Sequence, residues 1–152
     1  GHADDWRALF PVKLAIHSAE NKALTDASVN LSNLVGDRLE QYPAELELHD
    51  NQLINLDDKV SLQVIYTPGH SAGGVCLLVS YENHPQALIT GDTLFAGTVG
   101  RVDLNGGDAP TLMKSLQKLV KLSTAIGEET LVLPGHGPST TLKAEKANNP
   151  YL

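Results

Sequence analysis

Three short apolar segments of this chain each lead into a glycine that is followed by a histidine or an aspartate. The pairs are Gly69-His70, Gly91-Asp92 and Gly135-His136. The segments before them read as strands, and glycine lets the backbone turn sharply and pass close to a ligand. Three metal-type side chains at rigid strand ends can converge on one point at a sheet edge. The sequence therefore predicts a metal site built from His70, Asp92 and His136.

The strands around these pairs are predicted from periodicity. Apolar and polar residues alternate over Val60–Thr67, which indicates a strand with one buried face that stops at Pro68-Gly69. Apolar runs at Val75–Ser80 and Ala87–Thr90 predict central strands, joined by a turn at Asn83-His84-Pro85. The remaining short segments are expected as strands at Leu14–His17, Glu45–Leu48 and Thr130–Leu133, as an irregular segment at Asn30–Asp37, and as turn and loop at Asn51–Lys59.

One long helix is expected between the second and third pairs. Asp108 is a good N-cap, Pro110 suits the first turn, and Gly127 suits the end. Its apolar stripe is Leu112, Leu116, Leu119 and Val120, opposite Lys114, Lys118 and Lys121. Shorter helical turns are expected at Ala19–Leu24 and Thr141–Lys146.

The bulk properties exclude several classes of protein. The 152 residues suit a single domain over 1–152, and a hydrophobic fraction of 41% is enough for a core. A net charge of −7 with no basic face argues against a nucleic-acid partner. No apolar run is long enough to span a bilayer and no export signal opens the chain, so we expect a cytoplasmic protein without a membrane partner.

The lone cysteine and the other histidines receive plain interpretations. Cys76 lies inside an apolar run and is expected to be a buried core residue rather than a nucleophile, in a reducing compartment. A single histidine near a strand is more often structural than a ligand, and His17, His49 and His84 are assigned surface or structural roles. The other three positions differ because they recur in one Gly-flanked pattern. Imidazole suits zinc, iron and manganese, and a carboxylate can bridge two such ions.

At three places the sequence resembles the metallo-β-lactamase superfamily. The motifs are Thr67-Pro68-Gly69-His70-Ser71-Ala72-Gly73-Gly74, Gly91-Asp92-Thr93-Leu94-Phe95 and Leu133-Pro134-Gly135-His136-Gly137-Pro138. Gly100-Arg101-Val102-Asp103 and the ending Glu145–Leu152 are similar to the short bacterial members of its glyoxalase II-like (hydroxyacylglutathione hydrolase-like) branch. The resemblance implies an α/β fold, an αββα sandwich, in which His70 binds the first metal, His136 the second, and Asp92 bridges both. Enzymes that hydrolyse β-lactams often carry cysteine at the position of Asp92, so this residue favours the glyoxalase-like branch.

The resemblance breaks down at the start of the chain. The family's His-x-His-x-Asp-His motif is represented only by Gly1-His2-Ala3-Asp4-Asp5. On that alignment His2 binds the first metal and Asp4 the second, while Asp5 replaces the last histidine. Asp5–Phe10 is then the remainder of the following helix. The alternative is that Gly1 and His2 come from a tag. We expect a fold that lacks most N-terminal strands of the first sheet, and therefore a fragment, an oligomer or a chain complemented by another.

The implied function is metal-dependent hydrolysis of a glutathione or related thioester. One or two transition-metal ions are expected, zinc first, with iron and manganese as alternatives, and Asp92 and Asp4 are the candidate catalytic carboxylates. A metal pair lowers the pKa of water and supplies hydroxide near neutrality. Leu94–Arg101 is expected to form part of the pocket wall, with Arg101 paired to Asp103. Two alternatives stay open: a mononuclear iron persulfide dioxygenase and an inactive metal-binding fragment.

Overall fold

The computed structural model describes residues 3–34, 36 and 38–152. The chain divides into two compact units, Gly1–Leu48 and His49–Leu152, and each is described by itself. The single domain over 1–152 stays a prediction. Among the described residues, no helix is both long and apolar enough to cross a lipid bilayer.

The first unit is built from short elements. In chain order they are α1 (Ala3–Leu9), β1 (Ala15–His17), the 3₁₀ turn η1 (Ser18–Glu20), α2 (Asn21–Thr25), the 3₁₀ turn η2 (Ser32–Leu34) and β2 (Leu46–Leu48). β1 and β2 pair in parallel, and this is the strand structure that the described part of Gly1–Leu48 forms. The expected strands at Leu14–His17 and Glu45–Leu48 are confirmed, and so is a helix within Asp5–Phe10. Val35 and Asp37, in the expected irregular segment, lie outside the described residues.

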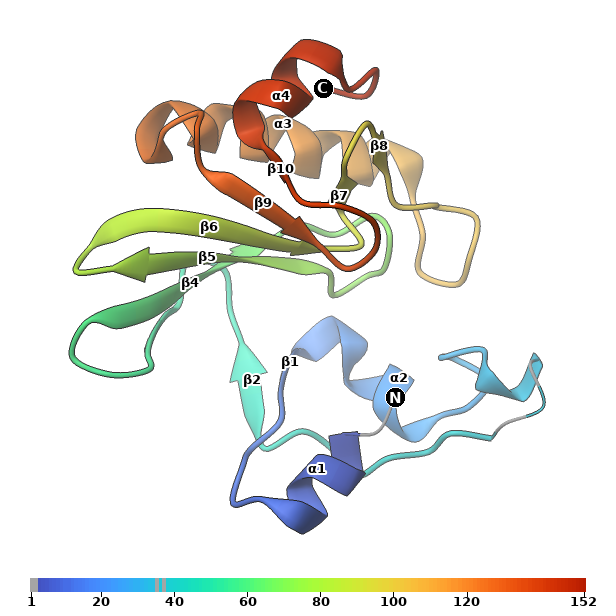
Figure 1. The fold of residues 1–152 in the computed structure, drawn as a ribbon. Coiled ribbons are helices and arrows are strands. Elements are labelled where there is room, and N and C mark those ends of the chain that lie inside the picture. The colour runs from blue at the N-terminus through green and yellow to red at the C-terminus, as the bar shows by residue number, and fades with distance from the viewer. Residues whose placement is uncertain (1–2, 35, 37) are drawn as a thin grey trace. The chain divides into compact units, whose positions relative to one another are not determined.

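The second unit is a six-stranded sheet with helices on one face (Figure 1). Its order is β10-β9-β6-β5-β4-β3, and β7 and β8 form a separate hairpin. The strands are β3 (Leu53–Asn55), β4 (Val60–Tyr66), β5 (Val75–Tyr81), β6 (His84–Gly91), β7 (Leu94–Phe95), β8 (Thr98–Val99), β9 (Leu131–Pro134) and β10 (Thr140–Thr141). The helices are α3 (Ala109–Ile126) and α4 (Leu142–Asn148), which lie on the same side of the sheet in Figure 1.

Strand direction brings the three Gly-flanked pairs to one edge of this sheet. β5 is antiparallel to both β4 and β6, and β6 is parallel to β9. β4, β6 and β9 therefore run the same way, and their carboxyl ends lie along one edge. His70, Asp92 and His136 follow these three ends, as the sequence predicts.

The core lies between the sheet and α3. Asp108 caps the helix by accepting a hydrogen bond from the Thr111 backbone N–H, and a proline stands in the first turn. The apolar stripe of α3 then packs on the sheet; the buried cluster is Ile65, Cys76, Leu78, Leu88, Leu94, Leu112, Leu116, Leu119, Val132 and Leu142. Burial of this kind contributes most of the stability of a small domain.

The opposite face of the sheet is also aliphatic. The pairing register places Ile54, Leu62, Val64, Leu77, Val79, Ala87, Ile89, Leu131 and Leu133 on it. A sheet that is apolar on both faces is typical of an architecture that covers both. The predicted mixed α/β class is confirmed.

Two predictions of local structure are wrong. Leu53–Asn55, expected as loop, forms β3. This segment is a strand because its backbone pairs with β4, and the sequence of the segment itself does not indicate that pairing. The turn before β6 consists of Glu82 and Asn83, both with positive φ (48° and 64°), so it is one residue earlier than expected. Pro85 belongs to the strand, where it stands beside a register shift and its missing N–H is tolerated.

Candidate metal site

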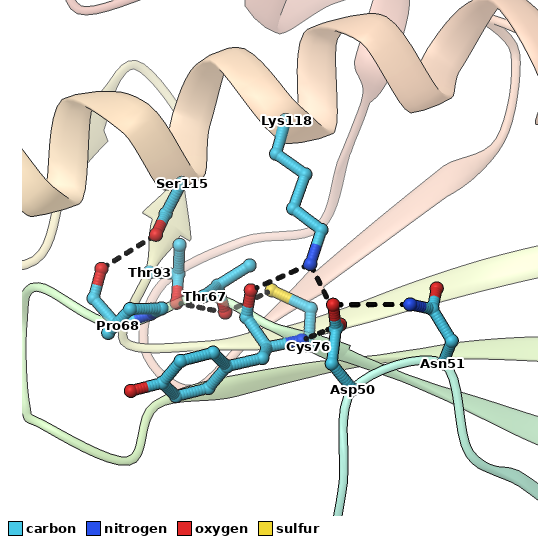
Figure 2. A network of polar contacts seen from close by, with 9 residues as sticks. Asp50, Asn51, Thr67, Pro68, Cys76, Thr93, Ser115 and Lys118 are labelled. Carbon is cyan, nitrogen blue, oxygen red and sulfur yellow. Dashed lines mark hydrogen bonds and ion pairs between the residues drawn. The ribbon is translucent and has the colours of Figure 1, made fainter.

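The loop that carries His70 is held by the start of α3. Asp108 donates its backbone N–H to the Gly69 carbonyl (2.8 Å), and the Ser115 hydroxyl donates to the Pro68 carbonyl (2.7 Å; Figure 2). Gly69 has φ of 132°, and a Cβ there would lie 2.3 Å from the Leu112 backbone nitrogen. Only glycine allows the loop to approach the helix this closely.

The loop that carries His136 is held against the end of β6. Gly135 donates its N–H to the Gly91 carbonyl (2.8 Å). A Cβ on Gly135 would stand 2.7 Å from Asp92 Oδ1. The absence of that atom leaves the Asp92 carboxylate room beside the neighbouring strand end. The glycines thus serve the close approach that the sequence predicts.

Asp92 stands between the two histidines. Its Oδ2 lies 3.5 Å from His70 Nε2, and its Oδ1 lies 3.6 Å from His136 Nε2. These separations are too long for hydrogen bonds. They are close to the roughly 3.4 Å that separates two donors of one tetrahedral ion when each bond is about 2.0–2.2 Å long. Each imidazole faces a different carboxylate oxygen, so the donor set fits two ions that share Asp92.

Asp92 is common to two pairs of side chains, one with His70 and one with His136. Within the part of the chain that the structure describes, no group of three His, Cys, Asp or Glu side chains converges on a single ion. Each of the two positions has one imidazole nitrogen and one carboxylate oxygen from these residues. This agrees with the expectation that His70, Asp92 and His136 alone form an incomplete set.

The orientation of the His70 ring is fixed by a hydrogen bond on the nitrogen that faces away from Asp92. Its Nδ1 lies 2.8 Å from the Arg101 carbonyl oxygen. A carbonyl only accepts, so Nδ1 carries a proton, and Nε2 is the ring nitrogen that faces Asp92 and would bind a metal. Metal-binding histidines are typically held in this way by a partner on the second ring nitrogen.

The three side chains open into a cavity of about 320 Å³. Its other lining residues are Phe95, Gly100 and Arg101, which confirms that Leu94–Arg101 supplies part of the wall. The Phe95 ring lies 6.1 Å from the His136 ring, tilted by 60°, and the His136 side chain is 81% exposed.

Arg101 pairs with Asp103, as predicted, through two hydrogen bonds of 2.7 Å. The guanidinium lowers the pKa of the Asp103 carboxyl to about 2. Both side chains are largely exposed, so the pair fixes the local loop without holding the guanidinium away from solvent.

A buried polar network lies beneath the ligand loops (Figure 2). The Thr67 hydroxyl lies 3.2 Å from the Thr93 hydroxyl and 3.3 Å from Cys76 Sγ. Burial raises the pKa of the Cys76 thiol to about 11, which confirms a core residue and argues against a nucleophile. The two threonines tie together the segments that follow β4 and β6. Sequence reasoning missed them, although both stand inside the quoted motifs.

The network continues to α3 through Lys118. Its ammonium donates to Asp50 Oδ1 (2.8 Å) and to the Tyr66 carbonyl (3.0 Å) at the end of β4 (Figure 2). The lysine was expected to mark the solvent side of the helix. Its side chain is partly exposed but reaches back to the sheet, because a long aliphatic stem can cover apolar surface while the charge finds a partner.

The two remaining candidate ligands lie in the first unit. His2 falls outside the described residues. Asp4 is in α1, where its Oδ1 accepts from the Arg7 guanidinium (2.8 Å) and its Oδ2 accepts from the Tyr42 backbone N–H (2.9 Å). The role of both residues as metal ligands stays a prediction.

His49 and His84, the other histidines of the second unit, are not part of the site formed by His70, Asp92 and His136. His49 and His84 are exposed, and in the first unit His17 Nδ1 accepts a hydrogen bond from the Ala19 N–H (3.3 Å). These positions agree with surface or structural roles.

Residues 1–136 match the family described as "Metallo-beta-lactamase superfamily". The probable metallo-hydrolase YqgX of Bacillus subtilis is 37% identical over 153 residues, which cover 100% of this chain and 69% of that protein. The hydroxyacylglutathione hydrolase GloC of Haemophilus influenzae is 33% identical over 104 residues, covering 68% of this chain and 45% of its own length.

Two solved structures share the fold over the whole chain. The BLEG-1 B3 metallo-beta-lactamase aligns with a TM-score of 0.87 at 34% identity, covering 100% of this chain and 70% of its own. TTHA1623 in a di-iron-bound form aligns with a TM-score of 0.80 at 31% identity, covering 100% of this chain and 71% of its own.

Proposed function

The chain belongs to the metallo-beta-lactamase superfamily, and from that premise we propose that it is a metal-dependent hydrolase acting on a thioester. The three motifs that indicated this superfamily are the ones that carry His70, Asp92 and His136. The single observation that carries the proposal is Asp92, placed with one carboxylate oxygen toward each of two histidines.

His70, Asp92 and His136 are the residues that would hold the metal. Imidazole nitrogen and carboxylate oxygen suit zinc, iron and manganese. We place zinc first, with iron as the main alternative, because a similar protein, TTHA1623, is known in a di-iron-bound form. The bound ions would supply Lewis acidity and lower the pKa of water.

The residues of this chain have their own tasks in that reaction. Asp92 stands between the two imidazoles, and its negative charge would offset part of the repulsion between two bound cations. The Arg101 carbonyl holds the proton of His70 on Nδ1, so the imidazole cannot turn its N–H toward the cavity. Phe95 forms an apolar wall of the cavity beside the His136 ring.

The choice of a thioester follows from what the cavity lacks. A thiolate is a good leaving group because thiol pKa values lie near about 8.5, so no strong general acid is needed. Apart from the two histidines, Asp92 and Arg101, the described residues that line the cavity carry no ionisable group. The similarity to a hydroxyacylglutathione hydrolase favours a glutathione thioester as the first substrate to test.

β-Lactams are the second substrate class, because one structurally similar protein is a B3 metallo-beta-lactamase at 34% identity. Asp92 argues against it on the sequence pattern. A chromogenic β-lactam and a lactoyl thioester of glutathione, offered to the same preparation, separate the two.

The test is reconstitution of the chain with Zn²⁺, Fe²⁺ or Mn²⁺, followed by elemental analysis and a thioester assay. We expect bound metal and thioester cleavage, both lost in His136→Ala and kept in the matched control His84→Ala, which alters an exposed histidine. One iron with oxygen consumption would favour a dioxygenase instead. No metal and no turnover after reconstitution would leave the chain as an inactive fragment and overturn the proposal.

A further inference from the structure

Glu145, in the last helix, carries a buried carboxylate that accepts hydrogen bonds from three segments of the chain. The residue is only 4% exposed. Oε2 accepts from the Gly97 backbone N–H (2.9 Å) and from the Asn149 amide (2.8 Å), and Oε1 accepts from the Thr140 hydroxyl (2.8 Å). The donors come from the β7–β8 turn, from the end of α4 and from β10.

Asn149 also forms hydrogen bonds with the β7–β8 hairpin. Its amide nitrogen lies 3.1 Å from the Thr98 carbonyl and 3.4 Å from the Phe95 carbonyl, besides the bond to Glu145. An amide NH₂ has two hydrogens, so the Phe95 contact is the weakest of the three. Asn149 is 6% exposed, and its Oδ1 accepts from the Tyr151 N–H. Together the two side chains hold both strands of the hairpin.

The hairpin and β10 both lead directly to the site. Phe95 in β7 contacts the His136 ring, and the segment after β8 delivers the Arg101 carbonyl to His70. Thr140 follows the His136 loop by four positions in the sequence. Glu145 and Asn149 therefore sit behind the supports of both imidazoles.

A purely structural role explains this carboxylate poorly. Within the described residues, no lysine, arginine or histidine forms an ion pair with Glu145, although the neighbouring Lys143 and Lys146 pair with Glu129 and Glu128. Burying a carboxylate without a cation is costly even when it is hydrogen-bonded, and an apolar residue would pack α4 on the sheet more cheaply. What a carboxylate adds is the ability to fix three donors in one geometry.

We propose that Glu145 and Asn149 are positioning residues, which hold the β7–β8 hairpin and the His136 loop so that His70 and His136 keep the orientation needed for metal. This inference rests on the proposed function for the identity of the ligand. It assigns a task to the Glu145–Leu152 motif, which the site itself leaves unused.

The experiment compares Glu145→Ala and Asn149→Ala with Thr141→Ala. Thr141 caps the same helix by accepting from the Ala144 N–H, whereas the hydrogen bonds to the hairpin come from Glu145 and Asn149, so Thr141→Ala controls for loss of helix stability. The first readout is the ¹⁵N NMR tautomer of His70 in the metal-free chain. We expect one Nδ1–H tautomer in the wild type and in Thr141→Ala, and a mixture in Glu145→Ala.

The second readout is Co²⁺ titration followed by the absorption spectrum. Loss of the hairpin support should weaken Co²⁺ binding by about 10-fold, the lower end of what outer ligand contacts contribute. Glu145→Gln keeps one acceptor oxygen and should lie between wild type and Glu145→Ala. If Glu145→Ala does not fold, Glu145→Gln and Asn149→Ala decide in its place.

The outcomes separate the two proposals. If the wild type takes up no Co²⁺, the proposed function fails, while the tautomer readout still tests the positioning role. If the Glu145 and Asn149 variants unfold at a lower temperature but keep the single His70 tautomer and the Co²⁺ affinity, the positioning role is overturned and Glu145 is only a packing residue.

Discussion

The two units of the chain differ in how their apolar residues are used. In His49–Leu152 a continuous core joins β4, β5, β6 and β9 to α3 and α4. In Gly1–Leu48 several large apolar side chains are exposed, including Trp6 at 61%, Leu9 at 75% and Phe10 at 48%. The three site residues that the structure brings together all come from the well-packed unit. A metal site needs a rigid scaffold, and the core of His49–Leu152 supplies one for these three residues.

The largest effect is expected from a cavity in the packed unit. Leu88 is fully buried in β6, three residues before Gly91, and belongs to the same core cluster as the buried leucines of α3. Leu88→Ala should lower the free energy of unfolding by about 2–5 kcal/mol, measured by urea denaturation. A loss under about 1 kcal/mol would mean that this core is looser than its burial indicates.

The next effect concerns the shared carboxylate. Asp92→Ala removes one donor from each metal position and should weaken metal binding by at least roughly 100-fold, measured by competition with a chromophoric chelator. Asp58→Ala, which removes an exposed carboxylate from the loop between β3 and β4, should leave the affinity unchanged. Equal affinities in the two variants would remove Asp92 from the site.

The sequence-based role of Asp4 can be tested in the same assay. If Asp4 is a ligand, Asp4→Ala should lower the bound metal by one ion per chain. An unchanged stoichiometry would show that its carboxylate serves only Arg7 and Tyr42 in the first unit.

Cys76 gives a chemical probe of the packed unit. Its pKa, raised from 9.0 to about 11, makes the thiolate fraction near neutral pH roughly 100-fold smaller than in an unfolded chain. We expect a disulfide reagent to react only after unfolding in urea. Because burial favours the protonated form, the thiol's contribution to stability is present below pH 9 and is lost as pH rises toward 11. Rapid labelling of the folded chain at neutral pH would contradict this.

The smallest effect is expected in the first unit. Leu9 in α1 is 75% exposed, so Leu9→Ala should change the free energy of unfolding by no more than about 0.5 kcal/mol. A larger loss would show that α1 is covered in solution, and the contrast between the units would then be smaller than the exposures indicate.

The sequence was informative where function depends on local pattern. The three site residues His70, Asp92 and His136 could be predicted because each follows a strand in a Gly-flanked motif. Their proximity could be predicted because the carboxyl ends of parallel strands lie at the same edge of a sheet. Asp108, Pro110 and Gly127 likewise gave the bounds of α3 to within a residue.

Contacts between distant segments were not predictable in this way. Glu145 lies between Lys143 and Lys146 on a short helix, so its sequence context is that of a surface residue. Its hydrogen-bond partner Gly97 is far away in the sequence. β3 and the β7–β8 hairpin have too few residues for a periodic signal, and their pairing partners define them. Thr67 and Thr93 carry no pattern of their own, and only the folded sheet shows that they meet.

The common edge of β4, β6 and β9 has a kinetic consequence. β6 and β9 pair in parallel across a connection that contains β7, β8 and α3, and pairing over such a long connection is slow compared with the formation of hairpins such as β5–β6. His136 arrives with β9, so a chain that has folded only through β6 holds His70 and Asp92 without their partner. We expect a late phase of refolding in which tight metal uptake begins, so that metal capture reports completion of the sheet rather than its first collapse.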